Sequence, residues 1–304
     1  FFPERRPFFI NGLDVFNFGR AREAQLFFSR RVGLAQGSPV PILGGLKAYG
    51  RAGRTSYGVL QVQTMATPEN PSRRVSESPA SSFSVGRVRY QATRNFNLGV
   101  MGLGEHRFRS PNEDNAAGGV DAQIFGFDGR LAGYAFIAGT WAEDPAQAAV
   151  IDETTGEELE VARGASQKSG GSAHASVEYQ GLYVRPSFRW LWSNEDFDPR
   201  MGFYRRTGTA RQVARLDLVP RPGVLGIREV SFGPEISAET EPDYSRRLTL
   251  EGKSSARISW NNGTDIRYNV TYFEDLVQNP FSLYGYEVDA GEYRGFRQRV
   301  RANS

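Results

Sequence analysis

The segment YQGLYVRPSFRWLWSNEDFDPRMGF, residues 179–203, decides the fold of this chain. From residue 182 to residue 193 apolar and polar side chains alternate, with Leu191 as the one exception. The apolar positions are Leu182, Val184, Pro186, Phe188, Trp190 and Trp192. Because successive side chains of a β-strand point to opposite faces, the segment predicts a strand with one apolar face and one basic face, which carries Arg185 and Arg189.

Composition narrows the class of protein. No run approaches the roughly 18 apolar residues that a membrane helix needs, so a transmembrane helix is excluded, whereas barrel strands are half polar and remain allowed. The chain has no cysteine and only two histidines, His106 and His174, which disfavours thiolate and histidine metal sites. No cofactor motif is present, and the net charge of +3 is too small to indicate nucleic acid. The first residue is Phe1, so we expect a mature form or a fragment.

The same alternation recurs along the chain and predicts about fourteen strands. Short turns and long loops alternate between them once residues 207–219 are counted as a strand. The predicted strands are 24–31, 41–52, 55–64, 82–92, 95–104, 118–127, 130–141, 171–179, 182–192, 207–219, 224–236, 246–260, 263–274 and 291–302. Residues 1–23 are rich in Phe without strand or helix periodicity, so we expect an aromatic lead-in or plug.

Several predicted strands reach 10–15 residues, enough to cross a bilayer at a tilt of about 45°. Short turns at one end and long loops at the other are typical of outer-membrane barrels. The sequence therefore predicts an all-β, antiparallel transmembrane β-barrel over residues 24–304, complete or partial. A soluble sandwich or lectin-like fold is the first alternative. A propeller or β-helix is less favoured, because no fixed-period repeat is present.

Basic side chains dominate the predicted lumen-facing positions. They are Arg51, Arg87, Arg89, Arg185, Arg189, Arg211, Arg215, Arg247, Lys253, Arg257 and Arg267. Gln61 and Gln63 are predicted among their few non-basic polar neighbours. A ring of fixed positive charge favours anions. The alternative is internal salt bridging that fills the interior.

The loop after Trp192 holds the best candidates for chemistry: Glu195, Asp196 and Asp198. Carboxylates at this spacing suit glycoside hydrolysis by general acid–base catalysis, or calcium binding. The alternative is a plain turn whose acids are solvated or pair with Arg200, Arg205 and Arg206. Glu113 and Asp114 are further weak calcium candidates. We favour a protein without a catalytic centre, and leave the enzyme alternative open.

Four motifs resemble one known family. They are residues 1–9 with 13–19 (FFPERRPFF and LDVFNFG), 26–33 with 41–45 (LFFSRRVG and PILGG), 196–208 (DFDPRMGFYRRTG) and 291–293 (GEY). In this order they resemble Gram-negative outer-membrane barrels that carry an N-terminal, family-9-like carbohydrate-binding module. The resemblance implies a β-barrel in the bacterial outer membrane and hints at glycans. The binding module is absent before Phe1, and the family's barrel continues beyond Ser304, so we expect a barrel that is incomplete at its C-terminus.

Three functions follow as hypotheses. The first is passage or surface binding of a polar or anionic solute, in which a glycan is included. The second is a membrane anchor for a periplasmic carbohydrate-binding module, and the third is a surface glycan hydrolase that uses the acidic loop at 194–198. The expected partners are outer-membrane lipid and glycans or anionic solutes, not nucleic acid. The oligomeric state is left open.

Overall fold

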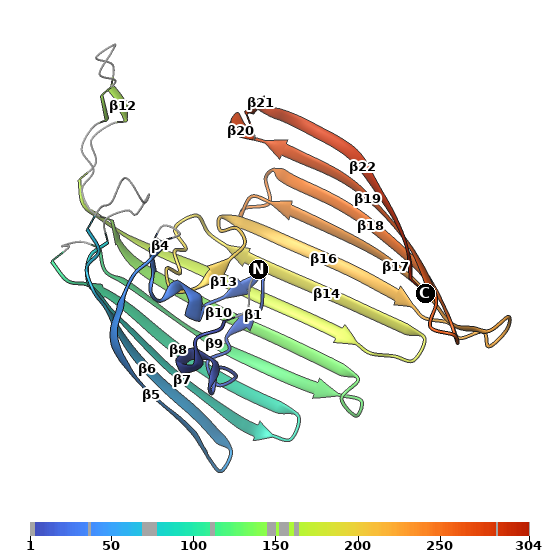
Figure 1. Cartoon of the computed structure of the whole chain (residues 1–304), viewed down its shortest axis with the longest axis horizontal. Coiled ribbons are helices and arrows are strands. Elements are labelled where there is room, and N and C mark those ends of the chain that lie inside the picture. The colour runs from blue at the N-terminus through green and yellow to red at the C-terminus, as the bar shows by residue number, and fades with distance from the viewer. Residues whose placement is uncertain are drawn as a thin grey trace. The chain divides into compact units, whose positions relative to one another are not determined.

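A computed structural model describes residues 4–35, 38–68, 78–109, 113–144, 150–151, 158–160, 164–283 and 285–303 (Figure 1). Strands make up 67% of the structure and helix is almost absent, which confirms the all-β prediction. No helix among these residues is long and apolar enough to cross a membrane.

Thirteen long strands form one antiparallel sheet. They are β5 (Ile42–Ala52), β6 (Thr55–Thr64), β7 (Ser81–Thr93), β8 (Phe96–Arg107), β9 (Asn115–Gly126), β10 (Leu131–Asp144), β13 (Ser166–Tyr179), β14 (Val184–Ser193), β16 (Thr209–Leu218), β17 (Ile227–Thr240), β18 (Arg247–Trp260), β19 (Asp265–Val277) and β22 (Gly291–Asn303). Each strand pairs with its neighbour in this order. Within the described residues no pairing joins β22 to β5, so no closed barrel is found.

Short elements complete the described chain. They are α1 (Pro7–Ile10), β1 (Gly19–Arg20), β2 (Ala24–Gln25), the 3-10 helix η1 (Ser29–Arg31), β3 (Leu34–Ala35), β4 (Ser38–Pro39), β11 (Val150–Ile151), β12 (Glu158–Glu160), β15 (Phe203–Tyr204), β20 (Phe281–Leu283) and β21 (Tyr286–Val288). The predicted strand at 24–31 is therefore wrong beyond β2. The consecutive residues Leu26 and Phe27 are both buried, which a flat strand with one covered face cannot achieve.

The chain divides into two compact units. The first comprises residues 1–122, 136–172 and 194–207, and the second comprises residues 123–135, 173–193 and 208–304. The long strands β9, β10 and β13 each contribute residues to both units.

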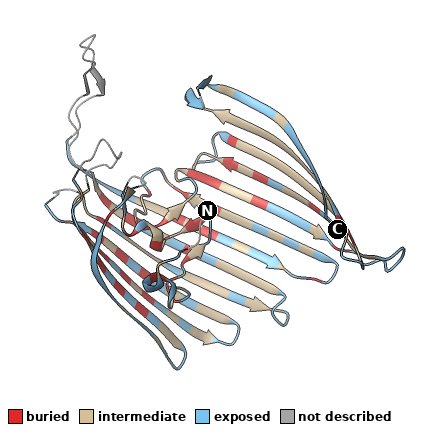
Figure 2. Ribbon diagram, viewed as in Figure 1, coloured by how far each residue is buried: buried red, intermediate tan, exposed pale blue. Residues whose placement is uncertain are grey.

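In the first unit, the N-terminal residues 4–33, called the cover segment below, pack on one face of the sheet. A Cβ added at Gly58 would lie 2.7 Å from the ring of Phe16, and one at Gly119 would lie 2.7 Å from the ring of Phe18. The buried residues on the two sides of this contact are Phe9, Val15, Phe16, Phe18, Leu26 and Phe27 from the cover segment and Leu60, Val62, Phe83, Val85, Met101 and Leu103 from the sheet. This covered face therefore holds the hydrophobic core of the first unit, and burial alternates along β6 and β7 (Figure 2).

The opposite face of the first unit is exposed and mostly apolar, with Gln61 and Gln63 among its polar residues. Leu46 on β5 is 80% exposed, and its neighbours on this face include Val59, Val88, Leu98 and Val100. The second unit shows the same contrast. On β22, Phe296 is 72% and Val300 67% exposed, and they pair with Tyr272 and Tyr268 of β19 on one face. The alternate residues of β22 and β19 form a charged face instead.

Candidate functional site

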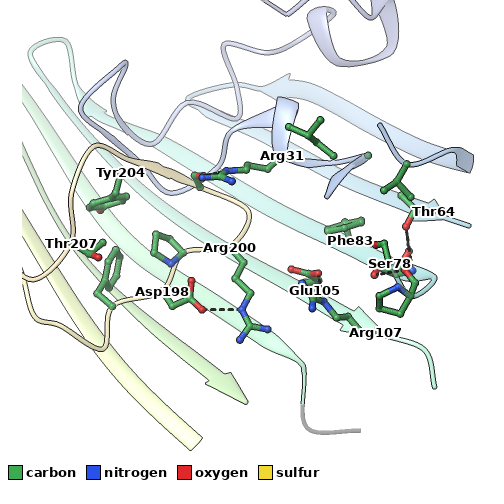
Figure 3. Close-up of a pocket in the computed structure, with 18 residues that line it drawn as sticks. Arg31, Thr64, Ser78, Phe83, Glu105, Arg107, Asp198, Arg200, Tyr204 and Thr207 are labelled. Carbon is green, nitrogen blue, oxygen red and sulfur yellow. Dashed lines mark hydrogen bonds and ion pairs between the residues drawn. The ribbon is translucent and has the colours of Figure 1, made fainter. Parts of the chain in front are cut away.

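The loop at 194–207, which holds the predicted acidic site, folds onto the covered face of the first unit (Figure 3). Within it, β15 pairs with β2 of the cover segment, with Phe203 opposite Gln25. The backbone N–H of Phe28 donates to the carbonyl of Met201 at 2.8 Å, and that of Arg205 to the carbonyl of Glu23 at 3.1 Å. The loop and the cover segment are thus one packed layer.

Arg200 fixes the acidic end of this loop. Its Nε donates a hydrogen bond to Oδ2 of Asp198 at 2.8 Å, and the two side chains form an ion pair. Its other nitrogens donate to the carbonyls of Glu113 at 2.8 Å and Glu143 at 3.0 Å. Because one guanidinium binds the loop, the end of β10 and the segment just before β9, it holds Asp198 against the sheet.

The backbone around Asp198 is held as firmly as its side chain. The Asp198 N–H donates to Oγ1 of Thr140 at 3.0 Å, and Nδ2 of Asn115 donates to the Asp198 carbonyl at 3.0 Å. Phe197 is buried, and a Cβ at Gly170 would lie 2.2 Å from its backbone nitrogen. Gly170 is therefore needed for the close approach of the loop to β13. The neighbouring Glu195 and Asp196 are exposed.

A polar pocket of about 410 Å³ lies beside this loop. Its charged lining residues are Arg31, Glu105, Arg107, Asp198 and Arg200 (Figure 3). Nε of Arg107 lies 2.8 Å from Glu105, and its Nη1 lies 3.0 Å from Glu113. The pocket therefore contains cations already paired with acids, which suits water and polar ligands better than an apolar one.

Tyr204 closes one side of the pocket. Its hydroxyl lies 3.3 Å from Oγ of Ser172, and its ring contacts that of Phe197 with centroids 4.9 Å apart. Burial raises the pKa of Tyr204 well above its ordinary value, against a smaller opposing effect of the hydrogen bond to Ser172. The phenol is therefore neutral at ordinary pH.

The calcium candidates are not gathered into one site. Oδ2 of Asp114 lies 2.7 Å from Nδ1 of His106, whereas Glu113 contacts Arg107 and Asp198 contacts Arg200. Burial opposes ionisation of Asp114, but hydrogen bonds from His106 and the Arg107 backbone outweigh it and lower its pKa. Within the part of the chain that the structure describes, no three His, Cys, Asp or Glu side chains converge as metal ligands do.

Arg87 is the most deeply placed of the predicted lumen-facing cations. It is 2% exposed on the covered face, where its Nη2 lies 2.8 Å from Oδ2 of Asp121. The ring centroid of Phe18 lies 5.2 Å from its guanidinium carbon. Arg89 and Arg51 lie on the same face nearer the short turns, and Arg51 donates to Oε1 of Gln91 at 3.2 Å.

The structure corrects the prediction for Gln61 and Gln63. Both lie on the exposed face, because Leu60 and Val62 occupy the covered face beneath the cover segment. On β6 the apolar row is therefore the one that packs against the second layer of chain, and the glutamines are exposed.

In the second unit, seven of the predicted cations share the charged face. They are Arg185, Arg189, Arg211, Arg215, Lys253, Arg257 and Arg267. Several are paired with acids: Arg215 lies 2.7 Å from Asp217, and Lys253 lies 2.6 Å from Glu251. The charged face therefore combines fixed positive charge with internal ion pairs.

Arg247 departs from the prediction. A register shift in the β17–β18 pairing places it opposite Thr240, and its guanidinium forms an ion pair with Glu274. Glu274 pairs with Leu250 on the apolar side of the sheet, so Arg247 lies away from the charged face. A bulge of this kind changes which face a side chain takes, and strict alternation cannot reveal it.

Sequence reasoning missed three arginines of β22: Arg297, Arg299 and Arg301. They lie opposite Thr271, Asn269 and Arg267, on the charged face. The alternation of the predicted strand at 291–302 already contained this signal. The sequence predicts Arg200 only as a partner for acids, because its hydrogen bonds to the carbonyls of Glu113 and Glu143 join residues that are remote in sequence.

Comparison with known proteins adds no assignment. No family model matches the chain, and no curated protein is significantly similar to it.

Proposed function

We propose that this chain forms the wall of a β-barrel in the bacterial outer membrane and that the barrel passes or binds polar, anionic solutes. In this arrangement the exposed apolar face contacts lipid. The covered face of the first unit and the charged face of the second unit line the aqueous interior. The resemblance to Gram-negative outer-membrane barrels agrees with this location and remains part of the proposal.

The separation of two faces across β18, β19 and β22 carries the proposal. One face presents Ile258 opposite Ile266, Tyr268 opposite Val300, and Tyr272 opposite Phe296. The other presents Lys253, Arg257, Arg267 and the three arginines of β22. A large exposed apolar surface marks a protein or membrane contact. A charged side chain that faces lipid costs about 2–4 kcal/mol at the membrane centre. The apolar face therefore suits lipid, and the charged face suits water.

Strand length supports the same proposal. The thirteen long strands contain 10–14 residues, and a tilted strand needs about 9–11 residues to cross the hydrocarbon core. Strands in soluble sheets usually contain about 5–6 residues. The long loops alternate with the short turns at Gly53, Asp128 and Asn262, as in barrels whose two ends face different compartments.

Reconstitution tests this function. The purified protein is refolded into phospholipid vesicles, and its insertion is measured as protection of the strands from added protease. Planar bilayers then give the conductance and the reversal potential in a potassium chloride gradient. We expect insertion and a reversal potential that favours chloride. Failure to insert would contradict the barrel, and insertion with no anion binding or preference would contradict the solute function.

The cover segment favours a second candidate, the membrane anchor for a periplasmic binding module. In the first unit it fills the covered face with buried aromatic side chains, including Phe9, Phe16 and Phe18. A barrel that is filled in this way suits support more than passage. The bilayer recording separates the two candidates, because an inserted protein that never conducts favours the anchor.

The hydrolase hypothesis depends on Glu195, Asp196 and Asp198. Asp198 is neutralised by Arg200, and the other two acids are exposed. Alanine replacement of each acid, assayed for release of reducing sugar from surface glycans, tests the hypothesis. If all three variants keep the activity of the unaltered protein, these acids are not catalytic residues.

A further inference from the structure

The charged face of the second unit contains a regular grid where β18, β19 and β22 pair. Arg257 lies opposite Arg267, which lies opposite Arg301. The next row contains Ser255, Asn269 and Arg299, and the third row contains Lys253, Thr271 and Arg297. Six of the nine positions are therefore cationic, and the other three carry neutral hydrogen-bonding groups.

Only part of this charge is compensated by acids. Nη2 of Arg257 lies 2.9 Å from Oδ1 of Asp265, and Nζ of Lys253 lies 2.6 Å from Glu251 and 3.6 Å from Glu235. Arg267, Arg297, Arg299 and Arg301 form no ion pair within the described residues. By contrast, Arg294 on the other face of β22 lies 2.9 Å from Glu292.

Like charges that lie directly opposite each other on a sheet destabilise it. The first row contains two such pairs, Arg257 with Arg267 and Arg267 with Arg301. Removal of this repulsion by a bound anion stabilises the sheet, because a ligand that binds only the folded state adds its binding free energy to the stability. A bound anion would therefore neutralise the positive charge of the grid that the chain's own acids leave uncompensated.

The spacing suits a ligand with more than one charged group. Residues two apart on a strand are separated by about 6–7 Å, and neighbouring strands by about 4.8 Å. Guanidinium groups bind carboxylate and phosphate with two parallel hydrogen bonds. A single small anion contacts one or two arginines of such a grid, whereas a ligand with several anionic groups spans three or four.

Polar space is present beside the grid. A cavity of about 520 Å³ on this face is lined by Lys253, Arg257, Arg267, Asn269 and Thr271 of the grid. Its lining also includes the acids Asp217 and Glu235, which form ion pairs with Arg215 and Lys253. The neutral side chains of the grid suit the hydroxyl groups of a polar solute.

We infer that the charged face on β18, β19 and β22 binds a solute that carries two or more carboxylate or phosphate groups. The inference rests on the proposed function, since it requires this face to be open to water. It assigns the binding to Arg267, Arg297, Arg299 and Arg301.

Isothermal titration of the refolded full chain with citrate and with tripolyphosphate tests this inference, and maltotriose serves as the neutral control. The variant Arg299→Gln/Arg301→Gln removes two unpaired cations, and Arg294→Gln removes one arginine from the other face of the same strand. Each lost charge-assisted contact is worth about tenfold in affinity. We therefore expect at least tenfold weaker binding in the double variant and unchanged binding in Arg294→Gln.

The two anions separate the chemical classes: preference for citrate assigns a carboxylate solute, and preference for tripolyphosphate assigns a phosphate solute. Absence of binding by both anions, or an equal loss in Arg294→Gln, would overturn the inference. Vesicle insertion is measured on the same samples. Normal insertion with a chloride preference but without binding of citrate or tripolyphosphate overturns the binding site alone, whereas failed insertion of the unaltered protein, or insertion without any anion preference, overturns the proposed function.

Discussion

The guanidinium of Arg87 lies 2.8 Å from the carboxylate of Asp121 beneath the cover segment, where Arg87 is buried and Asp121 is nearly so. Their side chains are 1% and 10% exposed. A buried ion pair contributes little net stability compared with apolar residues of the same size, but loss of one partner leaves an uncompensated charge. The pair lies where the sheet contacts Phe18 of the cover segment.

We expect Asp121→Leu to lower the free energy of unfolding by about 3–5 kcal/mol, because it leaves Arg87 charged and buried. The double variant Arg87→Met/Asp121→Leu should recover most of this loss. Urea unfolding in lipid vesicles, followed by tryptophan fluorescence, measures both. The control is Arg89→Met, on the same strand and face but less buried. A double variant as unstable as the single one would contradict the account.

Gly99→Ala should also destabilise the first unit. A Cβ at Gly99 would lie 2.2 Å from Oδ1 of Asp121 and 2.7 Å from the terminal nitrogens of Arg87. Overpacking of this kind costs about 1–3 kcal/mol. The matched control is Gly102→Ala on the same strand, where no atom lies within 4 Å of the new Cβ. The same urea experiment should separate the two variants, and equal stability would show that the contact is absent.

Arg200→Gln should release the loop at 194–207 from the sheet, because it removes the ion pair to Asp198 and the hydrogen bonds to two carbonyls. Limited proteolysis with mass spectrometry measures the release as faster cleavage within this loop. Arg205→Gln, an exposed neighbour in the same loop, is the control. Equal cleavage rates in the two variants would show that Arg200 is not the anchor.

The start of the cover segment should loosen in acid. Partial burial opposes ionisation of Glu4, but hydrogen bonds from Arg6 and Ser29 outweigh it and lower the pKa from 4.5 to about 2. Because the folded pKa is the lower one, this stabilisation is complete above about pH 4.5 and is lost as the pH falls towards 2.

Hydrogen exchange of residues 4–33 between pH 5 and pH 2 measures this effect. Glu4→Gln should exchange faster than the unaltered protein at pH 5 and at the same rate near pH 2. A difference that stays constant across this range would contradict the assignment to Glu4.

The sequence predicts the long strands well because their alternation is local. The alternation of short turns and long loops predicts the strand at 207–219, and β16 confirms it at Thr209–Leu218. The strand predicted at 24–31 is wrong because burial of Leu26 and Phe27 depends on a sheet that is distant in sequence. The plug prediction for residues 1–23 falls partly on residues 1–3, which lie outside the described residues.

The site was harder to predict, because side-chain faces depend on register and on what covers the sheet. The register shift at the start of β18, between Arg247 and Thr249, places Arg247 on the apolar side, and Leu60 and Val62 lie on the face that the cover segment covers. The acidic residues of the loop at 194–207 are visible in the sequence, but the partners of Asp198, Thr140 and Asn115, come from other strands. Spacing along the chain carries no information about such contacts.

The central claim is that alternate residues of one strand face lipid and water. The chain contains no cysteine, so single cysteines can be placed at residues 266–271 of β19 and labelled with a fluorophore in vesicles. Quenching by nitroxide-labelled lipid chains and by aqueous iodide then reports the environment of each position. The account predicts lipid quenching at 266, 268 and 270 and iodide quenching at 267, 269 and 271. Quenching by iodide alone at all six positions would contradict a membrane barrel.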